Sequence, residues 1–243
     1  MPAHTDEAFV LTRYAFRERD WVVVLLTRSA GLVKLVARRA RGARSGRGAT
    51  LDPLGLIRVS YFEKPGAELA TLDEVELVRS AFALAADSAR WASGQVVAEL
   101  ALTFCPPGQA NEAAYRLVGH CIDGLLAGHD PAAVWHYAEL WFLRLAGVFP
   151  ELDRCGVCGE ALSAGSRSYD GAERTFVCGQ HRPARPTLLS EQTVLWLRTA
   201  LHQPLAGVAS PAPRDAVAWL VAVRHHFTDR TLRSEAFLRS LLA

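Results

Sequence analysis

The stretch WVVVLLTRSAGLVKLVARRARGARSGRG, residues 21–48, decides how the first third of the chain folds. It contains an apolar run, 21–27, and an alternating segment, 32–39, which are separated by a turn of small residues at 29–31. Two such segments on either side of a small-residue turn predict a β-hairpin. Because the first run is apolar throughout, we expect it to form a buried strand.

Three further segments, 8–16, 54–63 and 68–75, are also predicted to be strands. Five short strands in so few residues fit a small closed barrel, and we expect an OB-fold. An SH3-like barrel fits the same number of strands, so the strand count alone leaves both open.

Basic residues accumulate in the hairpin and the loop after it, because no Asp or Glu occurs from position 21 to 51. Alternation along 32–39 turns Lys34 and Arg38 away from the core. A row of cations beside the glycine- and arginine-rich loop 40–48, expected to be flexible, is typical of a surface that binds a nucleic-acid backbone. The candidate DNA-binding residues are Arg28, Lys34, Arg38, Arg39, Arg41, Arg44, Arg47 and Arg58.

A solvated charged face is the alternative interpretation of this basic stretch. Aromatic residues in or beside the strands either fill the barrel or stack on bases; they are Tyr14, Phe16, Trp21, Tyr61 and Phe62. No pattern for reading bases is visible, so we expect DNA binding to be largely independent of sequence.

Beyond residue 75 the apolar pattern becomes helical. Apolar side chains recur at spacings of three and four over 110–125. The next helix is predicted to begin at Asp130 and Pro131, a cap followed by a favoured first helical residue. Further helices are predicted after Ser190, after Ser210 and over 231–242.

Two cysteine-containing pairs interrupt these helices. Two residues separate Cys155 from Cys158, and after a spacer of 19 residues Cys178 and His181 repeat that spacing. Such pairs are typical of a tetrahedral zinc site, and four protein ligands leave no position for water, so one structural Zn²⁺ is expected. The spacer is long enough for a hairpin that turns at Asp170-Gly171, which gives a zinc-ribbon-like element.

A redox-active CxxC is the alternative for the first pair. That chemistry normally places the motif at the start of a helix, where the thiolate is stabilised. Here a predicted helix precedes the motif and a glycine-rich hairpin follows it. Cys105 and Cys121 are expected to be buried apolar residues.

Composition and motifs exclude several classes of protein. No apolar run is long enough to cross a bilayer and no secretory signal is visible, so we expect a cytoplasmic protein. The net charge is only +2, so the basic stretch is a local feature. No phosphate-binding loop, nucleophile elbow or metalloprotease motif occurs, so no catalytic residue is predicted and the protein is not expected to be an enzyme.

Several segments resemble the RecO family of bacterial recombination mediators. VVVLLTRSAGLVKLVARRARG resembles the family's first hairpin, PELDRCGVCGE its first cysteine pair and RTLRSEAFLRSLL its C-terminal segment. The resemblance covers nearly the whole chain. His181 stands where many members have cysteine.

The resemblance implies an OB-fold that binds single- and double-stranded DNA, and a protein that anneals complementary strands at the nucleoid. It also implies cooperation with RecR, and possibly RecF, in loading a recombinase onto strands covered by single-strand DNA-binding protein. The acidic, apolar C-terminal tail of that protein would bind in the helical domain. A zinc element would support this domain.

We therefore expect an α+β multidomain protein. The OB-fold domain covers 1–78, an all-α helical domain covers 79–150 and 186–243, and the zinc-binding insert covers 151–185. The alternative function is a zinc-containing protein adaptor with a structural barrel and no direct DNA binding.

Overall fold

The computed structural model describes residues 3–41, 46–63 and 66–242, with the backbone alone at Gly46 and Arg47. The chain divides into two compact units, one of residues 1–131 with 232–243, and one of residues 132–231. The division into three domains at 78, 150 and 185 is based on the strand pattern, the helical pattern and the Cys/His pairs, and it stays a prediction. No helix in the described ranges is long and apolar enough to span a membrane.

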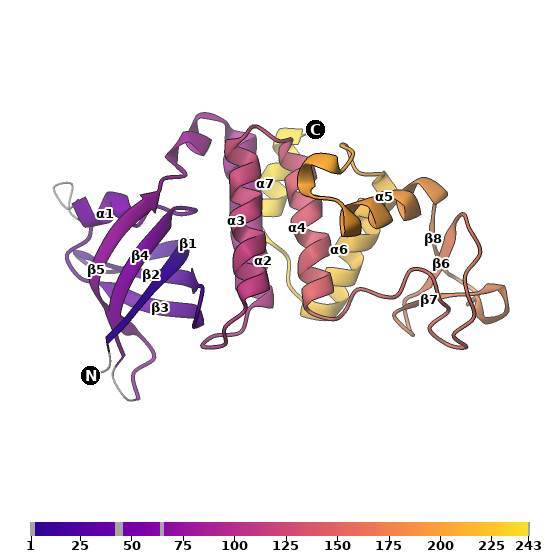
Figure 1. The fold of residues 1–243 in the computed structure, drawn as a ribbon, viewed down its shortest axis with the longest axis horizontal. Coiled ribbons are helices and arrows are strands. Elements are labelled where there is room, and N and C mark those ends of the chain that lie inside the picture. Colours follow the sequence, from indigo (N-terminus) through magenta and orange to yellow (C-terminus); the bar gives the residue numbers. More distant parts are fainter. Residues whose placement is uncertain (1–2, 42–45, 64–65, 243) are drawn as a thin grey trace. The chain divides into compact units, whose positions relative to one another are not determined.

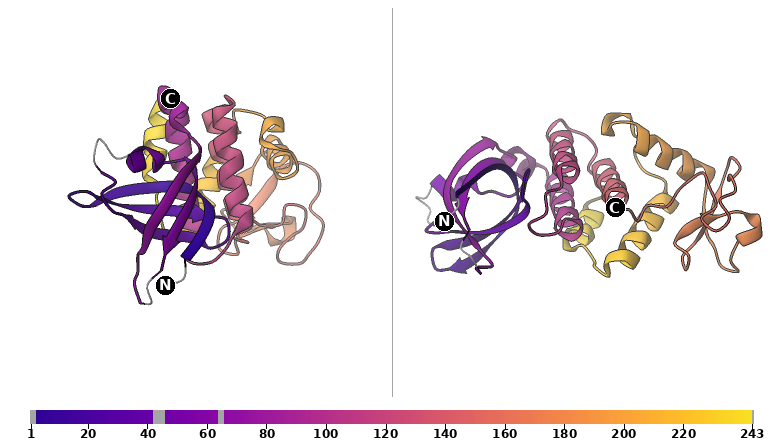
Figure 2. Two further views of the ribbon diagram at one scale, coloured as in Figure 1. Left: turned by 60° about the vertical axis from the view of Figure 1, so that its left-hand side comes forward. Right: turned by 60° about the horizontal axis from the view of Figure 1, so that its bottom comes forward.

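The first unit begins with five strands that close into a barrel (Figure 1, Figure 2). Their order around the barrel is β1-β2-β3-β5-β4, β4 pairs with β1, and β3 and β5 run parallel. The predicted hairpin is confirmed, and the last strand continues beyond its predicted end. The strands are β1 (Ala3–Arg17), β2 (Asp20–Thr27), β3 (Gly31–Ala37), β4 (Leu56–Phe62) and β5 (Ala70–Arg79).

Aliphatic side chains from all five strands fill the barrel. In β3, Val33, Leu35 and Ala37 join this core, whereas Lys34 is exposed, as the alternation predicts. Burying a valine or leucine fully stabilises the fold by about 1.5–3 kcal/mol. This core fixes the register of the hairpin, because a shift by one residue would turn Lys34 inward.

Helices cover the outer face of β1. Phe9 is buried, and its ring lies 5.0 Å from that of Tyr115 in α3 (Glu112–Leu126). A Cβ at Gly119 would lie 3.1 Å from Phe9 Cζ, so the missing side chain lets α3 approach the strand closely. α2 (Ser88–Phe104) contacts both β1 and α3.

The C-terminal helix α7 (Arg233–Leu242) returns to the first unit and packs on α2. Glu99 in α2 accepts hydrogen bonds from Ser234 N at 3.1 Å and from Ser234 Oγ at 3.2 Å. Ser234 N lies in the first turn of α7, where a backbone N–H has no acceptor within its own helix, so Glu99 satisfies it.

The segment 40–48 is not a loop throughout, because Gly46–Thr50 form the short helix α1. Residues 42–45 lie outside the described residues, as do Lys64 and Pro65. Short 3-10 helices occur at Phe82–Ala86, Gly179–His181 and Leu205–Gly207.

The second unit combines three helices with a small sheet (Figure 1). Its strand order is β7-β6-β8, and Trp219 of α6 contacts the rings of Tyr169 and Phe176 in the sheet. The elements are α4 (Pro131–Leu145), β6 (Arg167–Asp170), β7 (Thr175–Val177), β8 (Thr187–Leu189), α5 (Glu191–His202) and α6 (Arg214–Thr228).

The predicted starts of these helices are confirmed at Pro131 and Ser190, whose side chain accepts a bond from Thr193 N. The predicted start at Ser210 is wrong, because α6 begins at Arg214. Pro211 and Pro213 explain the delay, since the residue before a proline is disfavoured in helical conformation.

Candidate functional site

The first cysteine pair lies on a tight turn that is tied to the sheet. Cys155 N donates to Glu160 O at 2.8 Å, and Gly159 N donates back to Cys155 O at 2.8 Å. Gly156 N donates to Phe176 O at 2.9 Å, and a Cβ on Gly156 would lie 2.0 Å from Thr175 Oγ1. A side chain at position 156 would therefore push the turn away from β7.

The second pair follows β7 directly. His181 N donates to Cys178 O at 3.1 Å across a 3-10 turn. The hairpin β6–β7 that carries this pair is confirmed, but its turn is not the two-residue Asp-Gly turn expected. Asp170 Oδ1 instead accepts from Ala172 N and Glu173 N, and Arg174 takes the positive φ of 56°.

The four predicted ligand residues come together. Their donor atoms all lie within 4.8 Å of one another, an arrangement that could hold a metal ion. Cys158 Sγ lies 3.8 Å from Cys178 Sγ, and His181 Nδ1 lies 3.2 Å from Cys178 Sγ and 3.9 Å from Cys155 Sγ.

The surroundings of the two cysteines of the first pair shift the pKa values of their thiols. Burial raises the pKa of the Cys155 thiol, but backbone N–H groups of Cys158, Cys178 and Val157 outweigh this effect and lower it to about 6. The pKa of Cys158 is raised: the N–H of Glu160 lowers it, but burial and the neighbouring sulfurs outweigh that donor. A bound cation would favour the thiolate form of the cysteine ligands.

A buried arginine supports the first turn. Arg167 Nε donates to Leu152 O at 2.8 Å, and its Nη1 donates to Ser163 O at 2.6 Å. Asp153 lies 3.6 Å from Arg167 Nη2 and also pairs with Arg198 on α5. Sequence reasoning missed this residue, because arginines are mostly exposed and nothing in the local sequence marks this one as buried.

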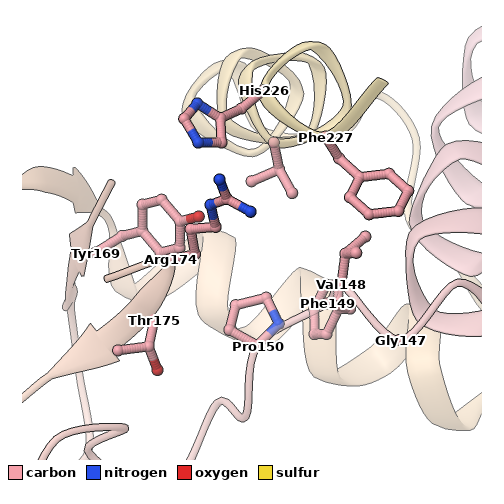
Figure 3. Close-up of a pocket in the computed structure, with 10 residues that line it drawn as sticks. Gly147, Val148, Phe149, Pro150, Tyr169, Arg174, Thr175, His226 and Phe227 are labelled. Atoms are coloured by element: carbon pink, nitrogen blue, oxygen red, sulfur yellow. The ribbon is translucent and has the colours of Figure 1, made fainter. Parts of the chain in front are cut away.

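A cavity of about 310 Å³ lies at the end of α6 (Figure 3). Residues 147–150, the β6–β7 hairpin and α6 line it. Figure 3 shows the Arg174 guanidinium inside it, near Tyr169 and His226, with Phe227 on the opposite wall. None of its described lining residues is a serine or cysteine, so it offers no such nucleophile.

Two of the predicted DNA-binding residues are paired with acids. Arg28 forms an ion pair with Glu112 of α3 at 2.9 Å, and this carboxylate raises its pKa. Arg58 lies between Glu7 and Glu76 on the two strands beside β4, at 3.4 and 3.3 Å. Both guanidiniums are half-exposed, but neither is as available to a phosphate as an unpaired cation.

Lys34, Arg38, Arg39 and Arg41 are exposed, and none forms an ion pair with a carboxylate in the described part of the chain. Arg44 lies outside the described residues. Arg47 is in α1, and its side chain is not described.

Arg41 connects this group to cations that sequence reasoning missed. Its N donates to Arg19 O at 3.0 Å and its Nη1 donates to Arg17 O at 3.2 Å, both at the β1–β2 turn. We call the exposed residues Arg17, Arg19, Arg38, Arg39 and Arg41 the basic rim. The pairing of β1 with β2 could have suggested Arg17 and Arg19, but Glu18 and Asp20 interrupt the charge pattern there.

Trp21 anchors the basic rim. The guanidiniums of Arg13 and Arg41 lie over its ring, 5.0 and 5.3 Å from the centroid. Arg13 also pairs with Asp52 at 2.6 Å, so it is a structural residue. Asp20 accepts a bond from the backbone N of Arg39 at 2.9 Å, so its carboxylate orders the chain there, and among the described residues it pairs with no guanidinium.

Comparison with known proteins gives a consistent result. The family model described as "Recombination protein O N terminal" matches residues 1–81, and "Recombination protein O C terminal" matches 85–236. "DNA repair protein RecO" of Anaeromyxobacter sp. (strain K) is 34% identical over 236 residues, which cover 94% of this chain and 93% of that protein. The protein of the same name from Koribacter versatilis is 32% identical over 249 residues, covering 97% and 98% of the two chains.

A third relative, from Geobacter sulfurreducens, is 30% identical over 240 residues that cover 97% of each chain. The two family models together match nearly the whole chain, and the relatives align with it over nearly their full length. The chain therefore belongs to the RecO family of DNA repair and recombination proteins.

Proposed function

We propose that this protein is a non-enzymatic DNA-binding recombination mediator that binds DNA through the basic rim and Lys34. The observation that carries the proposal is the junction made by Arg41, whose bonds to Arg17 O and Arg19 O join cations from two segments into one surface. Neutralising phosphates with such cations releases counterions, which is the main source of affinity without sequence preference.

The barrel supports this assignment. A closed order β1-β2-β3-β5-β4 with β3 and β5 parallel is the connectivity we assign to an OB-fold. That fold commonly binds single-stranded nucleic acid along a basic face with aromatic residues. An SH3-like barrel is the alternative that this strand order disfavours.

Annealing needs no catalytic group on such a surface. Two strands that approach each other are opposed by repulsion between their phosphates, and cations bound to both backbones reduce that repulsion. The Arg41 guanidinium, which donates to a backbone carbonyl rather than to a carboxylate, is suited to this role. It is a positive charge that a second strand can share.

The partners we propose follow from membership of the family. They are RecR, possibly RecF, and the C-terminal tail of single-strand DNA-binding protein, with the protein helping to load a recombinase onto coated single strands. This work would take place in the cytoplasm, at the nucleoid.

We propose that Cys155, Cys158, Cys178 and His181 hold one structural Zn²⁺. A tetrahedral site with Zn–S bonds of about 2.3 Å requires S···S distances of about 3.8 Å, and Cys158 and Cys178 lie 3.8 Å apart. The ion would stabilise the two turns and supply no reactive water, because four residues fill its coordination sphere.

The test is a charge-matched comparison. We expect replacing Arg38, Arg39 and Arg41 by alanine to weaken binding to an oligonucleotide by about tenfold or more, whatever its sequence. The control removes the same charge elsewhere, at the exposed residues Arg116, Arg185 and Arg214. Equal effects of the two triple variants would indicate a diffuse charge effect and contradict the proposed site.

A protein adaptor with a structural barrel is the competing function. It predicts that the chain still captures its protein partners while no DNA binding is detectable at any salt concentration.

A further inference from the structure

We propose that Tyr14 and Phe16 stack on unpaired bases and give this protein a preference for single-stranded over double-stranded DNA. The inference rests on the proposed DNA-binding function and assigns its single-strand contact to two side chains. Both belong to β1, two positions apart, and the strand ends one residue after Phe16.

The first observation is the exposure of these two rings. Tyr14 is 48% exposed and Phe16 is 46% exposed, although both belong to a strand of the barrel. Two other aromatic side chains of the barrel, Tyr61 and Phe9, are buried.

The second observation is that cations adjoin the two rings. The Arg17 guanidinium lies over the Phe16 ring, 5.3 Å from its centroid. Arg41 Nη1 bonds to Arg17 O, so the basic rim is continuous with the strand that carries both rings. A nucleotide that stacks on Phe16 would therefore have its phosphate near a guanidinium.

The third observation is an irregularity in the strand. The β1–β2 register shifts between Ala15 and Arg17, so that Phe16 has no directly opposed residue. Irregularities of this kind change the direction of a side chain and are common next to functional sites. Here the shift falls at one of the two exposed rings, at the edge of the barrel next to the basic rim.

These features predict that single-stranded and double-stranded DNA bind differently. The bases of a duplex are already stacked and paired, so a duplex can use the basic rim but not the rings. An unpaired base has a free face, and removal of a stacking ring typically costs on the order of tenfold in affinity. A docking site for an apolar protein segment is the competing explanation, and it predicts no effect on DNA.

The experiment compares oligothymidine with a duplex of the same length, using fluorescence anisotropy. We expect Tyr14→Ala and Phe16→Ala each to weaken oligothymidine binding by about fivefold or more and to leave duplex binding within about twofold. Phe16→Leu keeps an apolar side chain without the ring and should lose as much as Phe16→Ala. Phe16→Tyr keeps a ring and should bind like the parent.

Phe82→Ala is the matched control. Phe82 is 71% exposed in a 3-10 helix outside the five strands, and its loss should change neither affinity. Because the tested side chains are half-exposed, circular dichroism and thermal melting of each variant should match the parent.

Equal loss on both forms of DNA, or full affinity of Phe16→Leu, would overturn the inference and leave the proposed function intact. Failure of the unmodified protein to bind either DNA would overturn both. Unchanged DNA binding by the alanine variants together with lost binding of a purified protein partner would assign the rings to protein docking instead.

Discussion

The guanidinium of Arg41 lies over the ring of Trp21, 5.3 Å from its centroid, while its Nη1 donates to Arg17 O. Trp21 is at the start of β2, Arg41 follows β3 and Arg17 ends β1. One side chain therefore holds three segments of the barrel together. It also keeps its charge at the surface, because neither contact is a carboxylate.

Replacing Arg41 should separate its structural contact with Trp21 from the contribution of its charge to DNA binding. We expect Arg41→Ala to weaken single-strand binding by about three- to tenfold and to reduce the slope of log K against log salt by about one. Arg41→Lys should restore most of the salt slope but not all of the affinity, because a lysine cannot form the same planar contact with Trp21. Equal behaviour of both variants, in affinity and in slope, would contradict the role of the stack.

Glu18 should oppose DNA binding. It is the exposed acid in the turn between Arg17 and Asp20, so its carboxylate lies beside the basic rim. We expect Glu18→Gln to raise affinity for DNA by about two- to fivefold at low salt, with the gain shrinking as salt screens the charge. A gain that does not depend on salt would argue against an electrostatic cause.

Metal removal should affect the second unit selectively. We expect about one zinc per chain by elemental analysis and loss of the metal in Cys155→Ser. His181→Cys should keep it, because three or four thiolates both satisfy a tetrahedral zinc. The thermal stability of Cys155→Ser should fall, whereas single-strand affinity should change little. Full loss of DNA binding on chelation would show instead that the metal element takes part in it.

The start of α5 should depend on pH through Asp215. Its carboxylate accepts from Ser190 N at 2.7 Å and from Thr193 Oγ1. Burial alone would raise the pKa of Asp215, but the bonds from Thr193 and Ser190 outweigh it and lower the pKa below the ordinary 3.8. A lowered pKa means that the stabilisation is present at neutral pH and is lost as the pH falls below about 4.

Asp215→Asn should therefore destabilise the protein by about 1–2 kcal/mol at neutral pH, and the difference from the parent should shrink in acid. Chemical unfolding at both pH values measures this. A constant difference would show that the charge of Asp215 contributes nothing.

The buried pair Glu139–Arg224 should be costly to break. The atoms Arg224 Nε and Glu139 Oε1 lie 2.7 Å apart, and the two side chains are 1% and 0% exposed. We expect Glu139→Gln to lower the free energy of unfolding by about 3–5 kcal/mol, because it leaves a buried charge uncompensated. The double replacement Glu139→Leu with Arg224→Met should cost less than the two single changes together, and additive losses would contradict the pairing.

Local pattern was sufficient for much of the fold. The hairpin follows from the runs 21–27 and 32–39, because alternation and a turn of small residues are properties of the local sequence. Helix α2 was not predicted, although it is 17 residues long. It is buried on several sides, so its apolar residues form no single stripe.

The four residues of the candidate metal site could be predicted, because each pair has the short CxxC-like spacing, but the buried Arg167 that supports the first turn could not. The basic surface could be predicted only in part. Arg58 has the right charge and exposure, but Glu7 and Glu76 flank it on strands far away in sequence. Strand pairing decides which cations meet acids, and a charge count along the chain cannot reveal it.

The most direct test of the central claim is a titration of a fluorescent single-stranded oligonucleotide across a salt series. If the basic rim holds the phosphate backbone, log K should fall linearly with log salt, with a slope of about −0.7 per phosphate contacted. The triple Arg38, Arg39 and Arg41 variant should have a shallower slope than the charge-matched control. Affinity that stays constant between about 50 and 200 mM salt, or equal slopes for both variants, would contradict the account.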